Sequence, residues 1–442
     1  MKALEQKGAF RLLVAFSALC VLGPVPAVAQ LDTAPFAAFE SRPVTRIGIE
    51  GRRVTREYVI TREIETKVGE PFRLATLEAD LQRLENLGLF AETSVVPASD
   101  GEGVALTFTF KEMPPIIPFP SFLYTEENGF SYGAAVSAMN LTGRGISLSA
   151  RAYFGGTTQR WVRLSDPWIR GNHRSFDFFG GQRERFDTQN DFNEESWEFS
   201  PGFGTWLGRH GRLRLAPSLF KMQSDVAGKT LDPDNEDELV RLSVTIGYDN
   251  RDSWRSPRRG WKNELELIRT VGDGTFWTMN LDLRRYVPTW RRQNLLLSGL
   301  ATLQSGVVGQ DVPGYLTYYM GGANTIRGYQ LAELGPTLNG KNQLLTTAEY
   351  NFKLLDVARH DIFKWSFSLG LELALFADAG TAWSDSADFG WKRFRGGVGA
   401  GLRLLVPGTE QVRFDLGWSP QGGVHFHFAS GTKPNGQRQR LR

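Results

Sequence analysis

Alternating apolar and polar side chains, in segments of about ten residues separated by turn residues, fill the chain from Ile116 to Phe428. A period of two predicts β-strands with one apolar and one polar face. The segment 240–248 shows the pattern: its even positions are Val, Leu, Val, Ile and Tyr, and the odd positions between them are Arg, Ser, Thr and Gly. Such segments predict a mostly β chain with about 16 strands in roughly 310 residues.

Charge on the polar face separates two β architectures, because the strands of a soluble sandwich also alternate. Arg393, Arg395 and Arg403 share one side of a predicted strand, and the other side is apolar: Phe394, Val398, Leu402 and Leu404. A dry sandwich core is an unfavourable environment for the three arginines, because buried charges without partners are costly. A barrel with a polar lumen and lipid outside satisfies both faces. The sequence therefore predicts an antiparallel transmembrane β-barrel over residues 116–428, with outer-membrane lipid against its apolar face.

Residues 1–29 have the pattern of a secretory signal peptide. Basic residues such as Lys2 and Arg11 precede the apolar run Leu12–Leu22, and Ala27–Ala29 supplies the small residues of a cleavage site. Beyond this segment no stretch approaches the roughly 18 consecutive apolar residues of a spanning helix. The chain is therefore expected to be exported, and to cross a membrane only if its strands do so.

Composition narrows the function classes further. The 51 Lys and Arg residues nearly balance the 48 Asp and Glu residues, which argues against a nucleic-acid partner, since such proteins carry a clustered basic excess. The single cysteine, Cys20, lies in the predicted signal peptide, so no disulfide and no cysteine-bound metal is expected. His425 and His427 share a strand face but lack a third ligand nearby in sequence. We predict no metal and no cofactor.

A small α+β domain is predicted over residues 43–112, after a linker at 30–42. Its elements follow the order β-α-α-β-β: Val44–Glu50, Glu57–Thr66, Leu74–Leu87, Ala91–Pro97 and Val104–Lys111. Any small α+β domain could show this order. The order resembles a POTRA domain, with Leu87–Phe90 as the usual joint between helix and strand.

One connection in the predicted barrel is longer than the rest, and it runs from near Gly306 to near Asn342. Its segment 321–329 has the sequence Gly-Gly-Ala-Asn-Thr-Ile-Arg-Gly-Tyr. A loop this long inside a compact domain is usually functional. This connection is therefore the first place to look for a site.

Several ordered motifs resemble those of the outer-membrane protein assembly factor superfamily (BamA/TamA type, the bacterial surface antigen barrel). The inward-folded loop of that family, with its tip Val/Ile-Arg-Gly-Phe/Tyr, is matched by Gly321, Gly322, Ile326, Arg327, Gly328 and Tyr329. Its strand motif Phe-x-Asp-x-Gly is matched by Phe376, Asp378 and Gly380, and its turns by 248–252 and 166–168. The resemblance covers residues 43–428. It implies an outer-membrane barrel with a periplasmic POTRA domain that assembles or translocates unfolded client polypeptides without ATP.

Strand parity gives the loop arginine two partners. Asp378 and Glu349 lie on the predicted lumen face, so an Arg327 carried inward by the loop is expected to form charge-assisted, bidentate hydrogen bonds to one of them. Gly328 permits a tight backbone beside it. The alternative is that Arg327 lies in a solvated outer loop and pairs with nothing.

The boundary between the first and last barrel strands, here called the seam, is expected to be weak. Pro118 and Pro120 each remove a backbone donor from the first strand, which should therefore pair poorly. The last strand is short, follows Gly423 and ends at Phe428. A weak seam suits the family's lateral gate, at which an exposed edge receives a client strand. The alternative is a frayed start to the barrel.

Departures from the family leave the function open in part. The chain has room for one POTRA domain where BamA-like members carry several, and Phe428 is followed by a polar, basic tail at 429–442. The leading hypothesis is a non-enzymatic assembly or translocation factor that receives clients through its POTRA domain and seam, with room for periplasmic accessory proteins. The alternatives are a passive pore, an exporter of a non-polypeptide substrate on the same barrel, and an outer-membrane lipid hydrolase using a barrel serine and histidine.

Overall fold

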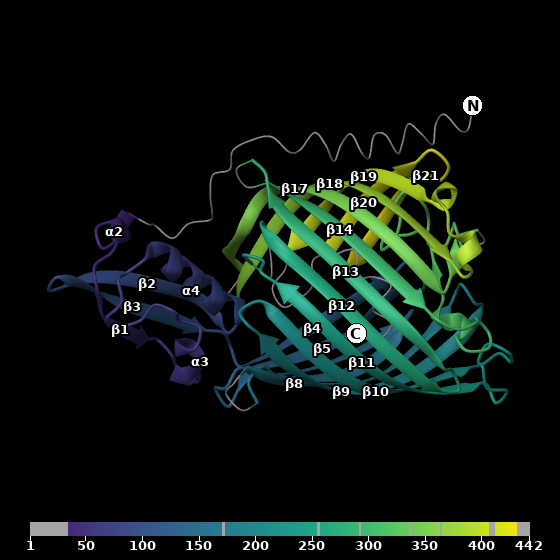
Figure 1. Cartoon of the computed structure of the whole chain (residues 1–442), viewed down its shortest axis with the longest axis horizontal. Coiled ribbons are helices and arrows are strands. Elements are labelled where there is room, and N and C mark those ends of the chain that lie inside the picture. Colours follow the sequence, from purple (N-terminus) through teal and green to yellow (C-terminus); the bar gives the residue numbers. More distant parts are fainter. Residues whose placement is uncertain are drawn as a thin grey trace.

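A small α+β domain is followed by a large curled sheet in the computed structural model (Figure 1). The structure describes residues 34–169, 173–253, 257–290, 293–335, 337–362, 365–405 and 412–430. The predicted signal peptide, residues 30–33 of the predicted linker and residues 431–442 of the predicted tail lie outside the described residues. Within the described ranges, every helix is too short or too polar to cross a membrane.

The small domain has the predicted order of elements. A three-stranded sheet in the order β1-β3-β2 is covered by two helices: β1 (Val44–Glu50), α3 (Glu57–Thr61), α4 (Leu74–Asn86), β2 (Phe90–Asp100) and β3 (Gly103–Glu112). Strand β1 is parallel to β3, and β2 is antiparallel to it. The leucines of α4 pack with the alternating residues of β3 into one apolar core, which includes Leu77, Leu84, Leu106, Phe108 and Phe110.

The second helix and the last two strands differ from their predicted bounds by one to three residues, and two larger differences in this domain have a structural cause. The first helix ends at Thr61 rather than at Thr66, because the buried carboxylate of Asp80 accepts the main-chain N–H of Glu65 and that of Thr66, at 2.8 and 3.0 Å. The predicted linker contains the short helix α2 (Ala34–Ala37), whose Phe36 is buried in the domain core. Asp80 ends the first helix and the domain core holds α2 in place, and both partners are distant in sequence from the segments that they fix.

The curled sheet has 16 strands, each antiparallel to its neighbours, as predicted. In order they are β4 (Ile116–Thr125), β5 (Gly129–Leu141), β6 (Ile146–Gly155), β7 (Thr158–Asp166), β8 (Arg174–Asp187), β9 (Phe192–Leu207), β10 (Gly211–Ser224), β11 (Glu236–Asp249), β12 (Gly260–Gly272), β13 (Phe276–Pro288), β14 (Gln293–Gln304), β17 (Asn342–Ile362), β18 (Trp365–Trp383), β19 (Arg395–Leu405), β20 (Val412–Ser419) and β21 (Gly423–Ser430). Strands β4 and β21 end the sheet, which curls into a barrel (Figure 1).

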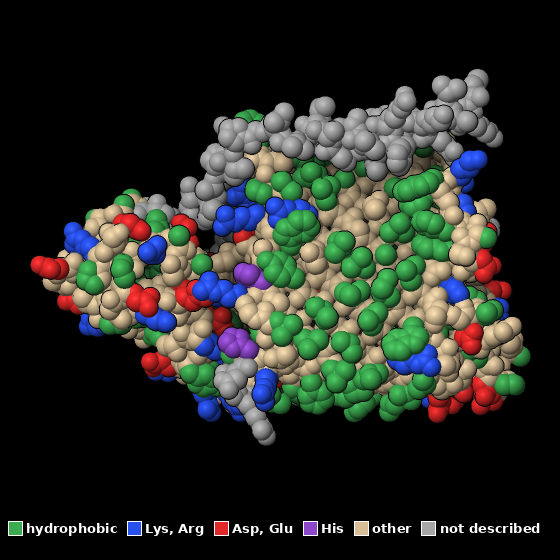
Figure 2. Space-filling model, viewed as in Figure 1, with side chains coloured by type: hydrophobic (Ala, Val, Ile, Leu, Met, Phe, Trp, Pro, Cys, Tyr) green, Lys and Arg blue, Asp and Glu red, His purple; other side chains and the backbone are tan. Residues whose placement is uncertain are grey.

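The two faces of the sheet differ as the alternation predicts. Along β11 the outward residues Val240, Leu242 and Ile246 are about half exposed, whereas Ser243 and Asp237 on the inner face are buried. Figure 2 shows apolar side chains spread over the outer face of the barrel and charged side chains gathered towards its two ends. The barrel therefore presents an apolar band to lipid and a polar wall to its interior.

One residue of the predicted charged face lies elsewhere. Arg393 belongs to the short 3-10 helix η3 (Trp391–Arg393) in the loop before β19, where its guanidinium contacts Asp388 and the carbonyl of Thr337. Arg393, Phe394 and Arg395 alternate in polarity as strand residues do, so periodicity alone did not reveal that the strand starts only at Arg395. Arg403 does lie on the inner face, fully buried.

The first strand pairs better than its prolines predict. Strand β4 pairs with β5 along its whole length, from Ile116 opposite Ala138 to Thr125 opposite Gly129, including Pro118 and Pro120. An edge strand tolerates proline because one of its two edges has no ladder partner. On that other side, the described residues form no ladder between β4 and β21. The prediction of poor pairing is therefore wrong for the β5 side.

Side chains join the two end strands. The rings of Tyr124 on β4 and Phe428 on β21 lie 5.4 Å apart between centroids, and Phe428 also packs on Phe414 of β20 at 5.0 Å. Strand β21 begins at Gly423 (φ +83°) and continues through Ser430, two residues beyond its predicted end. The predicted tail therefore contributes its first two residues to the barrel.

Candidate functional site

The long connection between β14 and β17, residues 305–341, folds into the barrel and is called the inward loop below. It contains the 3-10 helix η1 (Gly314–Leu316) and a small hairpin of β15 (Tyr318–Tyr319) and β16 (Asn339–Gly340). Its apolar residues pack against inner-face residues of the barrel wall in one buried cluster: Met320, Ile326, Tyr329, Leu334 and Leu338 with Leu300, Leu345 and Ala382. Burial of these side chains holds the loop inside.

The tip of the inward loop is a tight turn. Gly321 and Gly322 adopt φ of +108° and +106°, which side chains with a β-carbon rarely tolerate. The main-chain N–H of Gly322 donates to the carbonyl of Tyr329 at 3.1 Å, and that of Gly321 donates to the hydroxyl of Thr325 at 2.9 Å. These bonds close the turn, which contains the fully buried Arg327.

Arg327 is fully buried and faces three carboxylates. Its Nε and Nη2 donate to the two oxygens of Asp378 at 2.8 and 3.0 Å, in a bidentate pair. Its Nη1 donates to Glu349 at 3.0 Å and to Asp415 at 3.2 Å. The guanidinium carbon lies 3.3 Å from the ring centroid of Phe376, so the ring covers one face of the cation. All three guanidinium nitrogens thus donate to carboxylates of the barrel wall.

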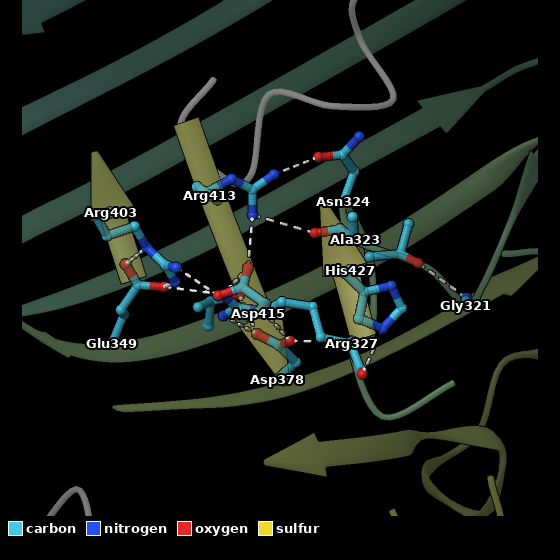
Figure 3. Close-up of polar contacts among 12 residues, drawn as sticks. Gly321, Ala323, Asn324, Arg327, Glu349, Asp378, Arg403, Arg413, Asp415 and His427 are labelled. Atoms are coloured by element: carbon cyan, nitrogen blue, oxygen red, sulfur yellow. Dashed lines mark hydrogen bonds and ion pairs between the residues drawn. The ribbon is translucent and has the colours of Figure 1, made fainter. Parts of the chain in front are cut away.

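Two more arginines share these carboxylates. Arg403 donates to Glu349 at 2.8 Å and also contacts Asp415. Arg413 lies 3.5 Å from Asp415 and donates to Asn324 of the loop at 2.7 Å. The charged network, defined as Arg327, Arg403 and Arg413 with Glu349, Asp378 and Asp415, therefore holds equal numbers of positive and negative groups (Figure 3). Such balance is needed because an unpaired charge at this depth is costly.

Glycines make room for the loop tip on the wall. A β-carbon at Gly397 would lie 2.6 Å from the main-chain nitrogen of Gly328, and one at Gly422 would lie 2.4 Å from its carbonyl oxygen. In the strand motif, a β-carbon at Gly380 would lie 2.5 Å from the side chain of Leu345. The loop main chain therefore sits directly on the main chain of the wall.

The structure brings together the loop and strand residues that the sequence singled out: Gly321, Gly322, Ile326, Arg327, Gly328, Tyr329, Glu349, Phe376, Asp378 and Gly380. Tyr329 is buried, and its hydroxyl donates to Gln421 at 3.4 Å. Sequence reasoning missed Asp415 and the roles of Arg403 and Arg413, although the alternation of Arg413 and Asp415 with Val412, Phe414 and Leu416 assigns them to a polar strand face.

The POTRA-like domain touches the barrel at three turns. The side chain of Asn140 donates to Thr55 at 2.7 Å, and the main-chain N–H of Arg56 donates to the carbonyl of Gly143 at 2.9 Å, in the β5–β6 turn. Arg62 lies over the ring of Trp168, at 4.2 Å, after β7. These contacts, called the docking contacts below, also include an ion pair of 3.0 Å between Glu65 and Arg209 in the β9–β10 turn.

Glu112 fixes the segment that makes these contacts. Its carboxylate accepts the main-chain N–H of Val54 at 2.9 Å and that of Thr55 at 2.7 Å. Burial by itself raises the pKa of Glu112, but the hydrogen bonds from Thr55 and Val54 outweigh burial and hold the pKa below its ordinary value. Glu112 is therefore ionised at neutral pH, and it accepts these hydrogen bonds as a carboxylate.

Two family models match this chain. The model described as the Omp85 superfamily domain matches residues 140–433, and the POTRA model described as a surface antigen variable number repeat matches residues 43–113. The chain belongs to the Omp85 superfamily. The barrel, the inward loop and the small domain are therefore the Omp85 barrel, its loop and a POTRA domain.

Individual relatives agree with the family. The chain is 25% identical over 401 residues to the outer membrane protein assembly factor BamA of Nitratidesulfovibrio vulgaris, covering 85% of this chain and 48% of that protein. It is 24% identical over 454 residues to BamA of Neisseria meningitidis serogroup B, covering 90% of this chain and 55% of that protein. The chain thus spans about half the length of these curated relatives.

Solved structures show the same fold. BamA from Haemophilus ducreyi lacking POTRA domains 1–3 gives a TM-score of 0.58 at 17% identity, covering 88% of this chain and 83% of that chain. CdiB from Escherichia coli gives 0.53 at 13% identity, covering 97% and 96%. The family and these relatives place the Omp85 protein in the Gram-negative outer membrane, with its POTRA domain in the periplasm. The docking contacts are therefore periplasmic, and the inward loop enters from the outer side.

Proposed function

We propose that this Omp85 protein assembles client polypeptides into the outer membrane, or translocates them across it, without ATP. The observation that carries the proposal is the inward loop held by Arg327, because the loop lies inside the barrel and is attached by contacts that can be broken and remade. The BamA relatives, of which the chain covers about half, are named as assembly factors. None of these steps requires a covalent reaction, so we propose a non-enzymatic protein.

The docking contacts support a role for the POTRA domain in delivery. They fix the domain beside the turns that follow β5, β7 and β9, so a client bound to it is held near the periplasmic mouth. The seam supplies the second element, because the described residues of β4 and β21 leave backbone groups along their facing edges without a ladder. We propose that a client strand pairs there by β-augmentation, with periplasmic accessory proteins as further partners.

A passive pore or an exporter of another substrate is the second candidate. One observation favours it: on the inner wall the pair Arg214 and Asp177, 2.5 Å apart, keeps about 30% of each side chain exposed. Part of the lumen is therefore wet. A water-filled passage of this kind suits solute flow if the loop moves aside.

Reconstitution separates the two candidates. Purified mature protein in liposomes should accelerate folding of an unfolded β-barrel client over empty liposomes, and Arg327→Ala should abolish the acceleration. Arg214→Ala is the matched control, because it removes a bidentate arginine from the inner wall without touching the loop. An absence of acceleration, with ion conductance intact, would favour the pore or exporter.

A further inference from the structure

His427 joins the inward loop to both ends of the sheet. The ring is 2% exposed and lies on the inner face of β21, the last strand. Its Nε2 lies 2.8 Å from the carbonyl oxygen of Arg327 (Figure 3), and its Nδ1 contacts the carboxylate of Glu126, one residue beyond the end of β4. The other oxygen of Glu126 accepts the main-chain N–H of Ala323 in the loop at 2.9 Å. One histidine and one glutamate therefore connect three elements that are far apart in sequence.

We infer that His427 and Glu126 are positioning residues that tie the seam to the inward loop through a shared proton. A carbonyl oxygen only accepts hydrogen bonds, so Nε2 of His427 must donate to Arg327. Nδ1 then faces a carboxylate oxygen, which also accepts when ionised. The Nδ1–oxygen contact is satisfied only when one proton lies between them, either on the ring or on the carboxyl group.

When that proton is lost, a favourable contact of the His427 ring becomes unfavourable. The neutral ring then keeps a single proton, on Nε2 or on Nδ1, so either the carboxylate of Glu126 or the carbonyl of Arg327 loses its donor, which is unfavourable at this depth. Either loss loosens the loop tip, because Glu126 also holds Ala323 and Arg327 itself belongs to the loop. Loop release and seam opening are thereby coupled, and both are favoured as the pH rises.

Other charged groups surround the pair. Asp415 lies opposite His427 in the β20–β21 register, Arg413 is two residues from Asp415, and both belong to the charged network. The guanidinium of Arg327 points away to its carboxylates, and His425 on the same strand lies 6.4 Å from His427 between ring centroids. Glu333 is 3.6 Å from His425. Among these groups, Glu126 is the one whose carboxylate contacts the His427 ring.

The test is single-channel conductance in planar bilayers, titrated from about pH 5 to about pH 9, the range in which histidine ordinarily changes charge. The open-to-closed ratio of the wild-type protein should rise with pH, by up to about tenfold per unit, the limit for one proton. Glu126→Gln should stay closed throughout, because an amide can donate to a neutral Nδ1 while its oxygen still accepts Ala323. His427→Ala should be open at every pH.

His425→Gln is the matched control and should titrate as the wild type does. His425 shares the strand face but contacts the carbonyl of Gly422 and, at 3.6 Å, Glu333 of the loop, and not Glu126, so a pH dependence that came from the His425–Glu333 pair would be lost in this variant. A wild-type protein without pH dependence, or Glu126→Gln titrating like the wild type, would overturn the inference. If His427→Ala fails to fold, the Glu126→Gln profile still decides. The readout needs no client, so failure of the proposed function and failure of this coupling are distinguishable.

Discussion

The main chain of Arg327 rests on Gly417: a β-carbon at Gly417 would lie 1.7 Å from the carbonyl oxygen of Arg327 and 2.4 Å from its carbonyl carbon. Gly417 lies on the inner face of β20, between Asp415 and Ser419, and Ser419 donates to the carbonyl of Gly328 at 2.8 Å. The loop tip is therefore seated where the wall has no side chain. This seat is as much a part of the site as the charges are.

Gly417→Ala should push the loop tip out of its seat. Overpacking of this kind costs about 1–3 kcal/mol. Because the clash exists only while the loop is inside, the population with a displaced loop should rise by roughly one to two orders of magnitude. Single-channel recordings should show more frequent and longer openings. Unchanged gating would show that the tip can shift at little cost.

Gly299→Ala is the control for that experiment. Gly299 lies on β14, and a β-carbon there would meet nothing within 4 Å. Both changes add one methyl group to a barrel strand and alter strand propensity equally. Only the change at Gly417 should alter conductance.

Asp378→Asn should weaken the site more than any loss of a surface charge. The carboxylate accepts from Nε, Nη2 and the main-chain N–H of Arg327, and also from the hydroxyl of Thr347. Asparagine keeps one acceptor oxygen and turns an amide group towards the guanidinium. Breaking a buried pair costs about 3–5 kcal/mol. Urea unfolding of the barrel in detergent should show a loss of this order.

Asp177→Asn offers a matched comparison. Asp177 also makes a bidentate pair, with Arg214, but both side chains are about 30% exposed. Solvent screens such a pair, so its loss should cost at most about 1 kcal/mol. Equal losses for the two variants would mean that burial of the Arg327 network adds nothing to its strength.

From the sequence alone, the strand faces that line this site could be predicted, but not all of its residues. Period two fixes which side of a strand a residue occupies, so Asp378 and Glu349 could be assigned to the lumen, and the family resemblance brought Arg327 to them. Parity also puts Asp415 on the polar face. It does not predict how far along the barrel axis Asp415 lies, or which residues of the neighbouring strands lie beside it. Those depend on register, which pairs Asp415 with Gly401 and His427.

Strand parity predicts nothing about the direction of side chains that lie outside strands. Glu126 lies in the turn after β4, where no period indicates a direction, and nothing in its neighbourhood distinguishes it from a solvated turn residue. The prolines of β4 misled for a related reason: the sequence records a missing donor but not which edge of the strand it faces. Fold class and strand number survive such errors, because they depend on the sum of many segments.

Gly143→Ala should detach the POTRA domain from the barrel. Gly143 adopts φ +72°, and a β-carbon there would lie 2.0 Å from the carbonyl oxygen of Val54. Gly208, in the β9–β10 turn, has a similar φ of +66° but open space around it. Gly208→Ala therefore carries the same backbone strain without the clash. Distances between spin labels on the two domains should broaden only for Gly143→Ala; equal broadening would assign the effect to turn strain.

Acid should release the same docking contacts through Glu112. Since the pKa of Glu112 is lower in the folded protein than the ordinary 4.5, its contribution to stability is present above that value and is lost as the pH falls through the lowered pKa. Protonation removes the charged acceptor of Val54 and Thr55, whose hydrogen bonds contribute about 1 kcal/mol each at most, given partial exposure. Hydrogen exchange of these two amides should accelerate below about pH 4.5 beyond the intrinsic rate. Glu112→Gln should show fast exchange at every pH, and a variant that still titrates would place the acid-sensitive group elsewhere.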